Sequence, residues 1–201
     1  MPTFLHNILK FPFVYTLTQS VLAPGAEQKI TKALRDLTER LPKPGRLLDV
    51  GCGPKSWLWK LGWQPTGLDL SFAYTRQFIK NRNSAVTGSC CQLPFADRSF
   101  HGVWTIGVLH HLDGAQARQA VTEMFRVCRP DGYVIIMDAV LPRSAWKRPI
   151  PYAIRKLDRG AWMRTDSQLE ALLPITISKS IRRYAYSYTG LEMLEYVCCS
   201  Q

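Results

Sequence analysis

The chain has 201 residues, a formal net charge of +11 and an apolar fraction of 46%, which together predict one globular domain with a substantial core. No apolar run reaches the ~18 residues of a membrane-spanning helix, and residues 1–10 lack the small-residue cleavage pattern of a signal peptide. The six cysteines include two adjacent pairs and no CxxC motif, so we expect reduced thiols in a cytoplasmic protein, without a zinc site or a disulfide framework.

Helix-like and strand-like stretches alternate along the chain, which is typical of an α/β fold with a mainly parallel sheet and helices on both faces. Two helical regions come first, over residues 4–21 and 25–40, and prolines follow the second. Strands are then predicted, with helices between them, at residues 46–50, 66–70, 85–88, 102–106 and 133–139. Residues 175–187 and 191–199, on either side of Tyr188-Thr189-Gly190, predict a closing antiparallel hairpin.

The most informative stretch is Leu47-Leu48-Asp49-Val50-Gly51-Cys52-Gly53, in which an apolar strand ends in an acid and then in glycines. Glycine lets the backbone come close to a ligand, and a following helix offers unpaired N–H groups. A second apolar strand ends at Asp69, 18 residues after Gly51. This spacing is typical of a carboxylate that accepts the two hydroxyls of a ribose, so the pattern predicts a nucleotide-like cofactor.

Four segments in this order resemble the class I S-adenosylmethionine-dependent methyltransferases, over about residues 46–140. LLDVGCG (47–53) resembles the first motif of that family and GLDLS (67–71) its ribose-binding acid. GSCCQLPFADRSFHGVW (88–104) resembles the adenine loop and fourth strand, and VLHHL (108–112) with FRVCRPDGYVIIMD (125–138) resembles the later helix and fifth strand. The resemblance implies a Rossmann-like doubly wound sheet of order 3-2-1-4-5-7-6, with S-adenosylmethionine as cofactor and S-adenosylhomocysteine as product.

The same resemblance implies which residues line the cofactor site. Asp69 would bind the ribose, and Asp49 would either contact the ligand or brace the glycine loop by accepting backbone N–H groups. An N-terminal helix that folds over the cofactor in similar enzymes would bring two further side chains to its methionine end. The full expected set is Asp49, Gly51, Cys52, Gly53, Asp69, Leu70, Ser89, Cys90, Cys91, Thr105, Tyr15 and Gln19.

Three positions depart from the family pattern. Lys55 stands where the third glycine is expected, Ser89 where an Asp would accept the adenine amino group, and His101 where an acid follows the Ser-Phe pair. A hydroxyl can accept the same hydrogen bond without charge assistance, so we expect modest cofactor affinity.

His110 and His111 follow the fourth strand, where open α/β sheets bind ligands. One of them would act as a base toward the acceptor, or both would cap and pack the helix that begins near Asp113. The sulfonium of the cofactor is already activated, and no cluster has metal-ligand spacing, so we expect no metal.

Basic residues are concentrated in residues 141–165, which we call the basic segment. It holds seven arginines and lysines and one acid, Asp158, with Trp146, Tyr152 and Trp162 among them. An anionic acceptor, an anionic membrane surface, nucleic acid and a merely solvated loop all fit this pattern. Apolar residues between Phe4 and Val14 also fit an interfacial helix or a cap packed on the domain.

Nucleic acid is the least favoured partner, because the fourth strand ends Trp104-Thr105-Ile106-Gly107 and the chain has no Pro-Cys pair or RNA-binding module. We expect one domain with an N-terminal helical cap (1–44), a cofactor-binding core (45–140), a basic lid insertion (141–165) and a C-terminal helix and hairpin (166–201). The predicted function is methyl transfer to a small-molecule or lipid-like acceptor, in the cytoplasm or peripheral to the membrane. The alternative is a noncatalytic binding protein that keeps the fold.

Overall fold

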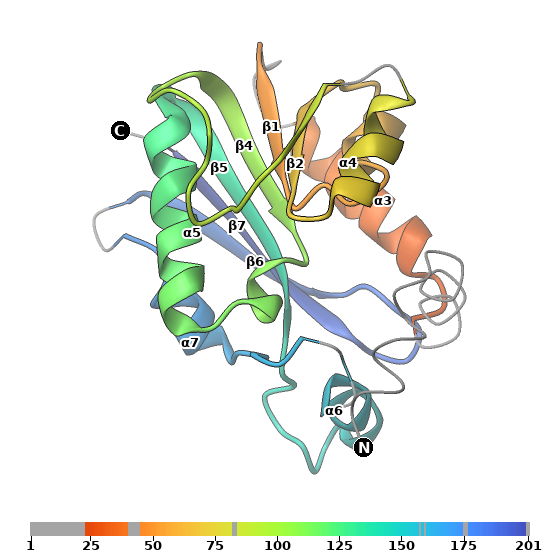
Figure 1. Ribbon diagram of the computed structural model, residues 1–201. Coiled ribbons are helices and arrows are strands. Elements are labelled where there is room, and N and C mark those ends of the chain that lie inside the picture. Colours follow the sequence, from red (N-terminus) through yellow and green to blue (C-terminus); the bar gives the residue numbers. More distant parts are fainter. Residues whose placement is uncertain are drawn as a thin grey trace.

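The computed structural model describes residues 23–39, 45–81, 84–156, 158, 160–174 and 177–199. Their strands form one seven-stranded sheet of order β3-β2-β1-β4-β5-β7-β6, in which β7 runs antiparallel to both of its neighbours and the other pairs are parallel (Figure 1). The strands are β1 (Leu47–Val50), β2 (Thr66–Asp69), β3 (Ala85–Thr87), β4 (Phe100–Ile106), β5 (Cys128–Val140), β6 (Lys179–Ala185) and β7 (Glu192–Cys199). The predicted strand order and the closing hairpin are confirmed.

Several strand boundaries differ from the prediction by one or two residues, and two strand starts differ by more. Strand β5 starts at Cys128, five residues earlier than expected, because Cys128 pairs with Phe100 before a register shift brings Tyr133 opposite Gly102. Strand β6 starts at Lys179 instead of residue 175, and residues 175–176 lie outside the described part of the chain.

Short helices connect the strands: α3 (Ala26–Thr38), η1 (Trp57–Leu61), α4 (Phe72–Ile79), η2 (Leu109–His111), α5 (Gly114–Val127), α6 (Pro149–Lys156) and α7 (Asp166–Glu170). Reciprocal caps start two of them, Asp113 with Gln116 on α5 and Thr165 with Gln168 on α7. The helix expected over residues 4–21 lies outside the described residues. None of the described helices is long and apolar enough to cross a bilayer.

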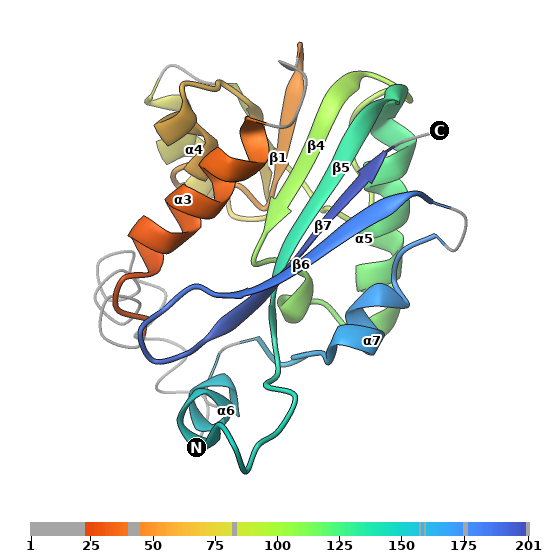
Figure 2. The same ribbon diagram turned by 180° about the vertical axis from the view of Figure 1, so that it is seen from behind.

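Alternate residues of β5 build the two halves of the core. Val134 and Ile136 pack in a cluster with α5 and α7, whereas Ile135 and Met137 pack in a cluster with α3 and η1. Figure 1 shows α5 in front of the sheet, and Figure 2, turned by 180°, shows α3 in front. The sheet is therefore covered on both faces, as predicted.

The carboxyl ends of the parallel strands lie at one edge of the sheet, and α6 lies beyond that edge in both views (Figures 1 and 2). All the loops with polar strand-end residues therefore meet at this edge, as is usual for ligand sites in open α/β sheets.

Candidate active site

The glycine loop after β1 is fixed by backbone hydrogen bonds. The N–H groups of Gly51 and Cys52 both donate to the carbonyl of Leu68, at 2.7 and 3.0 Å. Gly51 has φ +72°, and a Cβ there would lie 2.2 Å from Cγ2 of Val108. Gly53 has φ +60°, but a Cβ there would meet nothing within 4 Å. Gly51 is thus required by packing and conformation, whereas Gly53 keeps open space above the loop.

Asp69 ends β2 beside this loop and is half-buried. One carboxylate oxygen accepts the N–H of Gly53 at 3.0 Å and the other accepts the N–H of Ser71 at 2.8 Å. The carboxylate thus ties the glycine loop to the start of α4. An ionised carboxylate can accept about four hydrogen bonds, so about two acceptor positions remain for a ligand.

Asp49 has a different environment, because its side chain is buried and accepts the hydroxyl of Ser56 at 2.5 Å. Ser56 in turn accepts the N–H of Leu58 and so caps η1. Burial raises the pKa of Asp49 to about 6, although the Ser56 hydrogen bond opposes the shift. The N–H groups of the glycine loop bind Leu68 and Asp69 instead of Asp49, which holds the start of η1 through Ser56.

The third loop, after β3, contains Ser89, Cys90 and Cys91. Ser89 is exposed, and its hydroxyl accepts the N–H of Cys91 at 3.2 Å. Burial raises the pKa of Cys90 to about 12, and it also raises that of Cys52, so both thiols stay protonated near neutral pH. These cysteines can offer backbone groups and packing, not thiolate chemistry.

The remaining expected cofactor residues have mixed positions. Leu70 is 78% exposed, next to Asp69, and Phe72, the first residue of α4, is 69% exposed, so both offer apolar surface at the strand end. Thr105 is buried within β4, and its hydroxyl has no hydrogen-bond partner among the described residues. Tyr15 and Gln19 lie outside the described residues.

The two histidines lie on η2 and differ in their contacts. His110 is buried, and its Nδ1 lies 2.5 Å from Oδ1 of Asp138, which ends the apolar core of β5. The backbone N–H of His110 also donates to the other oxygen of Asp138 at 3.2 Å. His111 is exposed, with its ring 4.1 Å from that of His110. The structure thus distinguishes the two, since His110 is buried and paired with Asp138 whereas His111 is exposed.

The pair has opposite pKa shifts. Burial disfavours the protonated imidazole of His110, but the Asp138 carboxylate outweighs it and raises the pKa. Burial alone would raise the pKa of Asp138, but His110 lowers it. Sequence reasoning missed Asp138, although it has the same signal as Asp49 and Asp69: an acid at the end of an apolar strand.

The end of the basic segment holds η2 in place. The Trp162 N–H donates to the carbonyl of His110 at 3.0 Å, and buried Arg164 donates to the carbonyls of Leu109 and Leu112 at 2.6 and 2.7 Å. A Cβ on Gly160 would lie 2.1 Å from Cδ2 of His110. His110 is therefore enclosed on one side by backbone alone.

Most cations of the basic segment have partners within the protein. Arg155 is 4% exposed and donates to Asp158, to the Tyr186 hydroxyl and to the carbonyl of Glu192. Arg148 pairs with the Glu192 carboxylate and donates to the Gly190 carbonyl. Arg143 pairs with Asp166. These arginines hold the segment against β7 and α7.

The comparisons with known proteins agree with the fold. A family model described as a methyltransferase domain matches residues 48–136. A SAM-dependent methyltransferase of Thermotoga maritima, titled a possible histamine N-methyltransferase, superimposes with a TM-score of 0.75 at 16% identity, covering 97% of this chain and 99% of that one. The chain is therefore similar, in its fold and over residues 48–136, to S-adenosylmethionine-dependent methyltransferases.

Two curated methyltransferases match part of the chain. A demethylmenaquinone methyltransferase of Roseiflexus sp. (strain RS-1) is 33% identical over 111 residues, 51% of this chain and 46% of that protein. A probable tRNA methyltransferase 9B of Bos taurus is 35% identical over 98 residues, 47% of this chain and 21% of that protein. The chain thus spans less than half the length of either relative.

The strand-end groups fit the cofactor of this methyltransferase family. Asp69 has about two acceptor positions left, and a ribose presents two hydroxyls. The apolar surface of Leu70 and Phe72 lies beside it, and the space over Gly53 is open. In the described ranges, no group of three or more His, Cys, Asp or Glu side chains is placed to hold a metal ion.

Proposed function

We propose that this methyltransferase moves the methyl group of S-adenosylmethionine to a small organic acceptor, a class that includes acceptors dissolved in lipid, by in-line displacement without a metal ion. The observation that carries the proposal is the half-buried Asp69 carboxylate, which holds the glycine loop and keeps acceptor positions free. In this proposal Asp69 binds the ribose, and the Gly51–Gly53 backbone and Leu70 line the rest of the cofactor.

The other residues of the cofactor site have lesser roles. When bound, S-adenosylmethionine supplies a methyl group on a sulfonium that needs little further activation. Asp49 fixes Ser56 at the start of η1, and its buried carboxyl lies near enough to Asp69 for the two charges to interact. The turn at Ser89 to Cys91 contacts the adenine in this proposal, with Cys52 packed under the glycine loop and Thr105 behind it in β4.

His110 is the base of the proposed reaction, and Asp138 is its positioning residue. Nδ1 is held by Asp138, and no described residue gives Nε2 a hydrogen-bond partner. The ring carbons on either side of Nε2 face Gly107 and Gly160, so no side chain covers this edge from those two positions. A buried His–Asp pair of this kind can accept a proton from a hydroxyl, an amine or an acidic carbon. His111 differs in being exposed, whereas His110 is buried against Asp138.

If His110 is the base, its raised pKa determines how turnover depends on pH. His110 accepts a proton only when neutral, so turnover should rise with pH through a value above the ordinary ~6.5 of a histidine. Asp138→Asn removes the carboxylate that raises this pKa, so the rising limb should move to lower pH while turnover falls. His110→Gln should lower kcat by about 10²-fold or more with cofactor binding intact. A pH profile that does not move in Asp138→Asn would contradict the assignment.

The acceptor class is proposed from two considerations. The relative that acts, by its name, on demethylmenaquinone supports a small lipid-soluble acceptor. The relative named as a tRNA methyltransferase favours RNA, but binding RNA would require several cations to face its phosphates. Arg143, Arg148, Arg155 and Arg164 instead bind groups of the protein itself. For the same reason an anionic acceptor is not part of the proposal.

Calorimetric titration with S-adenosylmethionine and S-adenosylhomocysteine tests the cofactor site. Asp69→Ala should weaken binding by about 1.5–3 kcal/mol, because it removes hydrogen bonds to a charged group. Asp131→Ala, an exposed acid at the start of β5, is the matched control and should leave binding unchanged. An unchanged dissociation constant in Asp69→Ala would remove the ribose assignment.

A turnover measurement separates an enzyme from the alternative, a noncatalytic binding protein. Lys55 and Ser89, which depart from the family pattern of cofactor-binding residues, are the reason for this alternative. The full chain is incubated with labelled cofactor and a cell extract, which is then separated into solvent-soluble, RNA and protein fractions. Label in the solvent-soluble fraction is expected. Label in the RNA fraction would show that the acceptor is RNA and not a small molecule. Cofactor binding without transfer of label to any fraction would support the noncatalytic binding protein.

A further inference from the structure

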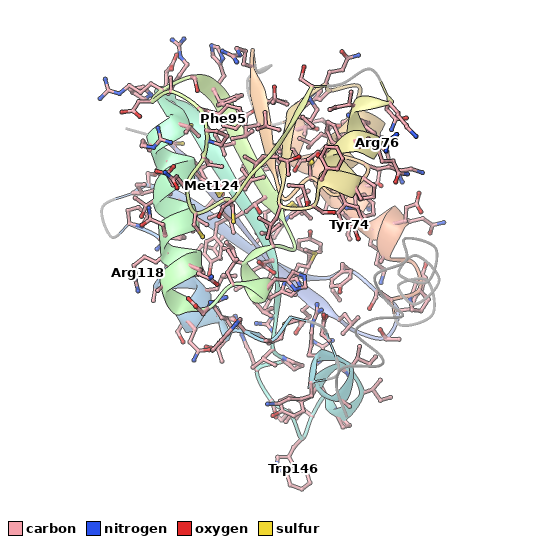
Figure 3. The ribbon with its side chains drawn as sticks, viewed as in Figure 1. Tyr74, Arg76, Phe95, Arg118, Met124 and Trp146 are labelled. Atoms are coloured by element: carbon pink, nitrogen blue, oxygen red, sulfur yellow. The ribbon has the colours of Figure 1, made fainter. Side chains whose placement is uncertain are left out.

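The outer surface of α6 and the residues just before this helix present apolar and cationic side chains together at one end of the molecule. We call it the α6 tip, and it consists of Trp146, Lys147, Ile150, Ala153 and Lys156. Trp146 is 96% exposed and Ile150 is 65% exposed, the first being the most exposed large apolar side chain of the described residues. Figure 3 shows Trp146 at the extreme end of the molecule, pointing away from it. Such exposure is unusual for tryptophan and marks an interaction surface.

The tip is held firmly to the sheet. On the inner face of α6, Pro151 and Arg155 are buried, and Arg155 donates to the Tyr186 hydroxyl and the Glu192 carbonyl. Just before α6, Arg148 pairs with Glu192. The inward residues therefore anchor the helix, and Trp146 and Ile150 project from a fixed support.

The exposed charges of the tip are all positive. Lys147 and Lys156 have no acidic partner among the described residues, and Lys156 lies over the ring of Tyr152 at 5.7 Å. Asp158 is the single acid of the basic segment, and it pairs with Arg155. A partner that meets Trp146 therefore also meets uncompensated lysines, so charge complementarity requires an anionic partner.

We propose that the α6 tip docks on an anionic phospholipid bilayer. Tryptophan is favoured at the level of lipid headgroups, an adjacent aliphatic side chain adds apolar insertion, and lysines attract anionic lipids. A stable protein interface buries about 800 Å² on each partner and uses 20–30 residues a side. Five tip residues fall far short of that, whereas a bilayer needs only one or two inserted side chains.

The location of the tip gives the docking a consequence for the active site. The tip and the carboxyl ends of the strands lie at the same edge of the sheet (Figures 1 and 2). Docking would therefore turn the active-site edge toward the membrane, where a lipid-soluble acceptor resides. This consequence rests on the proposed function, but the docking itself does not.

Vesicle sedimentation of the full chain tests the docking without any enzyme assay. Vesicles of phosphatidylcholine alone are compared with vesicles that also contain phosphatidylglycerol, at low and high salt. Binding is expected only to the anionic vesicles and should weaken as salt rises. Lys147→Glu removes one positive charge and adds a negative one, so binding should fall at least about tenfold.

Matched variants separate the tip from the rest of the surface. Trp146→Ala and Ile150→Ser should each weaken vesicle binding at least about fivefold. Ile79→Ser is the control, because Ile79 on α4 is 50% exposed and lies away from the tip. Cofactor binding and the thermal midpoint should stay unchanged in all three, so a failure here differs from a failure of the proposed function.

Three results would overturn the proposal. Absence of binding to anionic vesicles would do so directly. Equal binding by Trp146→Ala and the parent chain would show that another part of the chain meets the lipid. Concentration-dependent dimers that Trp146→Ala abolishes, without any vesicle binding, would show that the tip meets a second copy.

Discussion

The strand-end loops after β1 and β2 and the basic segment after β5 lie at the same edge of the sheet, yet they use their polar groups in opposite ways. At the first site, Asp69 accepts two backbone N–H groups and keeps about two acceptor positions for a ligand. In the basic segment, Arg155 and Arg164 are buried and bind groups of the protein.

This difference shows that the number of charged residues in a segment does not tell how many of them are free to bind a partner. A buried cation is costly unless it is fully paired, so a chain that buries several arginines must supply acceptors for them. Strand β7 and η2 supply these acceptors as the Glu192 carboxylate and backbone carbonyls. The few exposed lysines are what remains for a partner.

The largest effect should come from removing a buried cation of the basic segment. Arg155→Met keeps most of the side-chain volume but leaves Asp158, the Tyr186 hydroxyl and the Glu192 carbonyl without their donor. We expect a loss of about 3–5 kcal/mol in the free energy of unfolding, measured by urea titration. Lys147→Ala, in the same segment but exposed, should change it by less than about 0.5 kcal/mol.

Equal losses in these two variants would contradict the comparison. So would a stable Arg155→Met protein whose cofactor or acceptor binding alone is impaired, because the guanidinium would then serve a ligand and not the fold.

The sequence predicts those site residues whose signals lie close together along the chain. Gly51, Gly53 and Asp69 were predicted because glycine conformations and strand ends leave local signals within about twenty residues. The His110 to Asp138 pair was not predicted in full, because its members are 28 residues apart and meet only through the register of β4 and β5. The partners of Arg148 and Arg155 lie on β7, which no charge count could indicate.

The pH dependence of the free energy of unfolding tests the comparison at a third residue, Asp49. Burial raises the pKa of Asp49 from 3.8 to about 6, so folding favours its neutral form. That contribution is fully present below about pH 4 and is lost as pH rises through about 6. It corresponds to about 3 kcal/mol, since one pKa unit is about 1.4 kcal/mol. Asp49→Asn cannot ionise, so its unfolding free energy should not carry this decline between pH 4 and 7.

A second variant identifies the origin of the shift. Ser56→Ala removes the hydroxyl that stabilises the ionised carboxylate, so the pKa of Asp49 should rise further and the decline should move to higher pH. If the pH dependence of Asp49→Asn matches that of the parent chain, another group causes it.

The smallest expected effect concerns the third loop, which follows β3. Ser89 is exposed, and its hydroxyl accepts the Cys91 N–H, a bond that an Asp side chain can also accept. Ser89→Asp should therefore preserve the turn while adding a charged acceptor, and charge-assisted hydrogen bonds are about twice as strong as neutral ones. We expect cofactor affinity to stay equal or to improve by up to about 1 kcal/mol in calorimetry, with Ser99→Asp as an exchange outside the turn that leaves it unchanged. A marked loss of affinity in Ser89→Asp would mean that the loop does not face the adenine amino group, and Ser89 would then belong with Asp49 among residues that only shape the backbone.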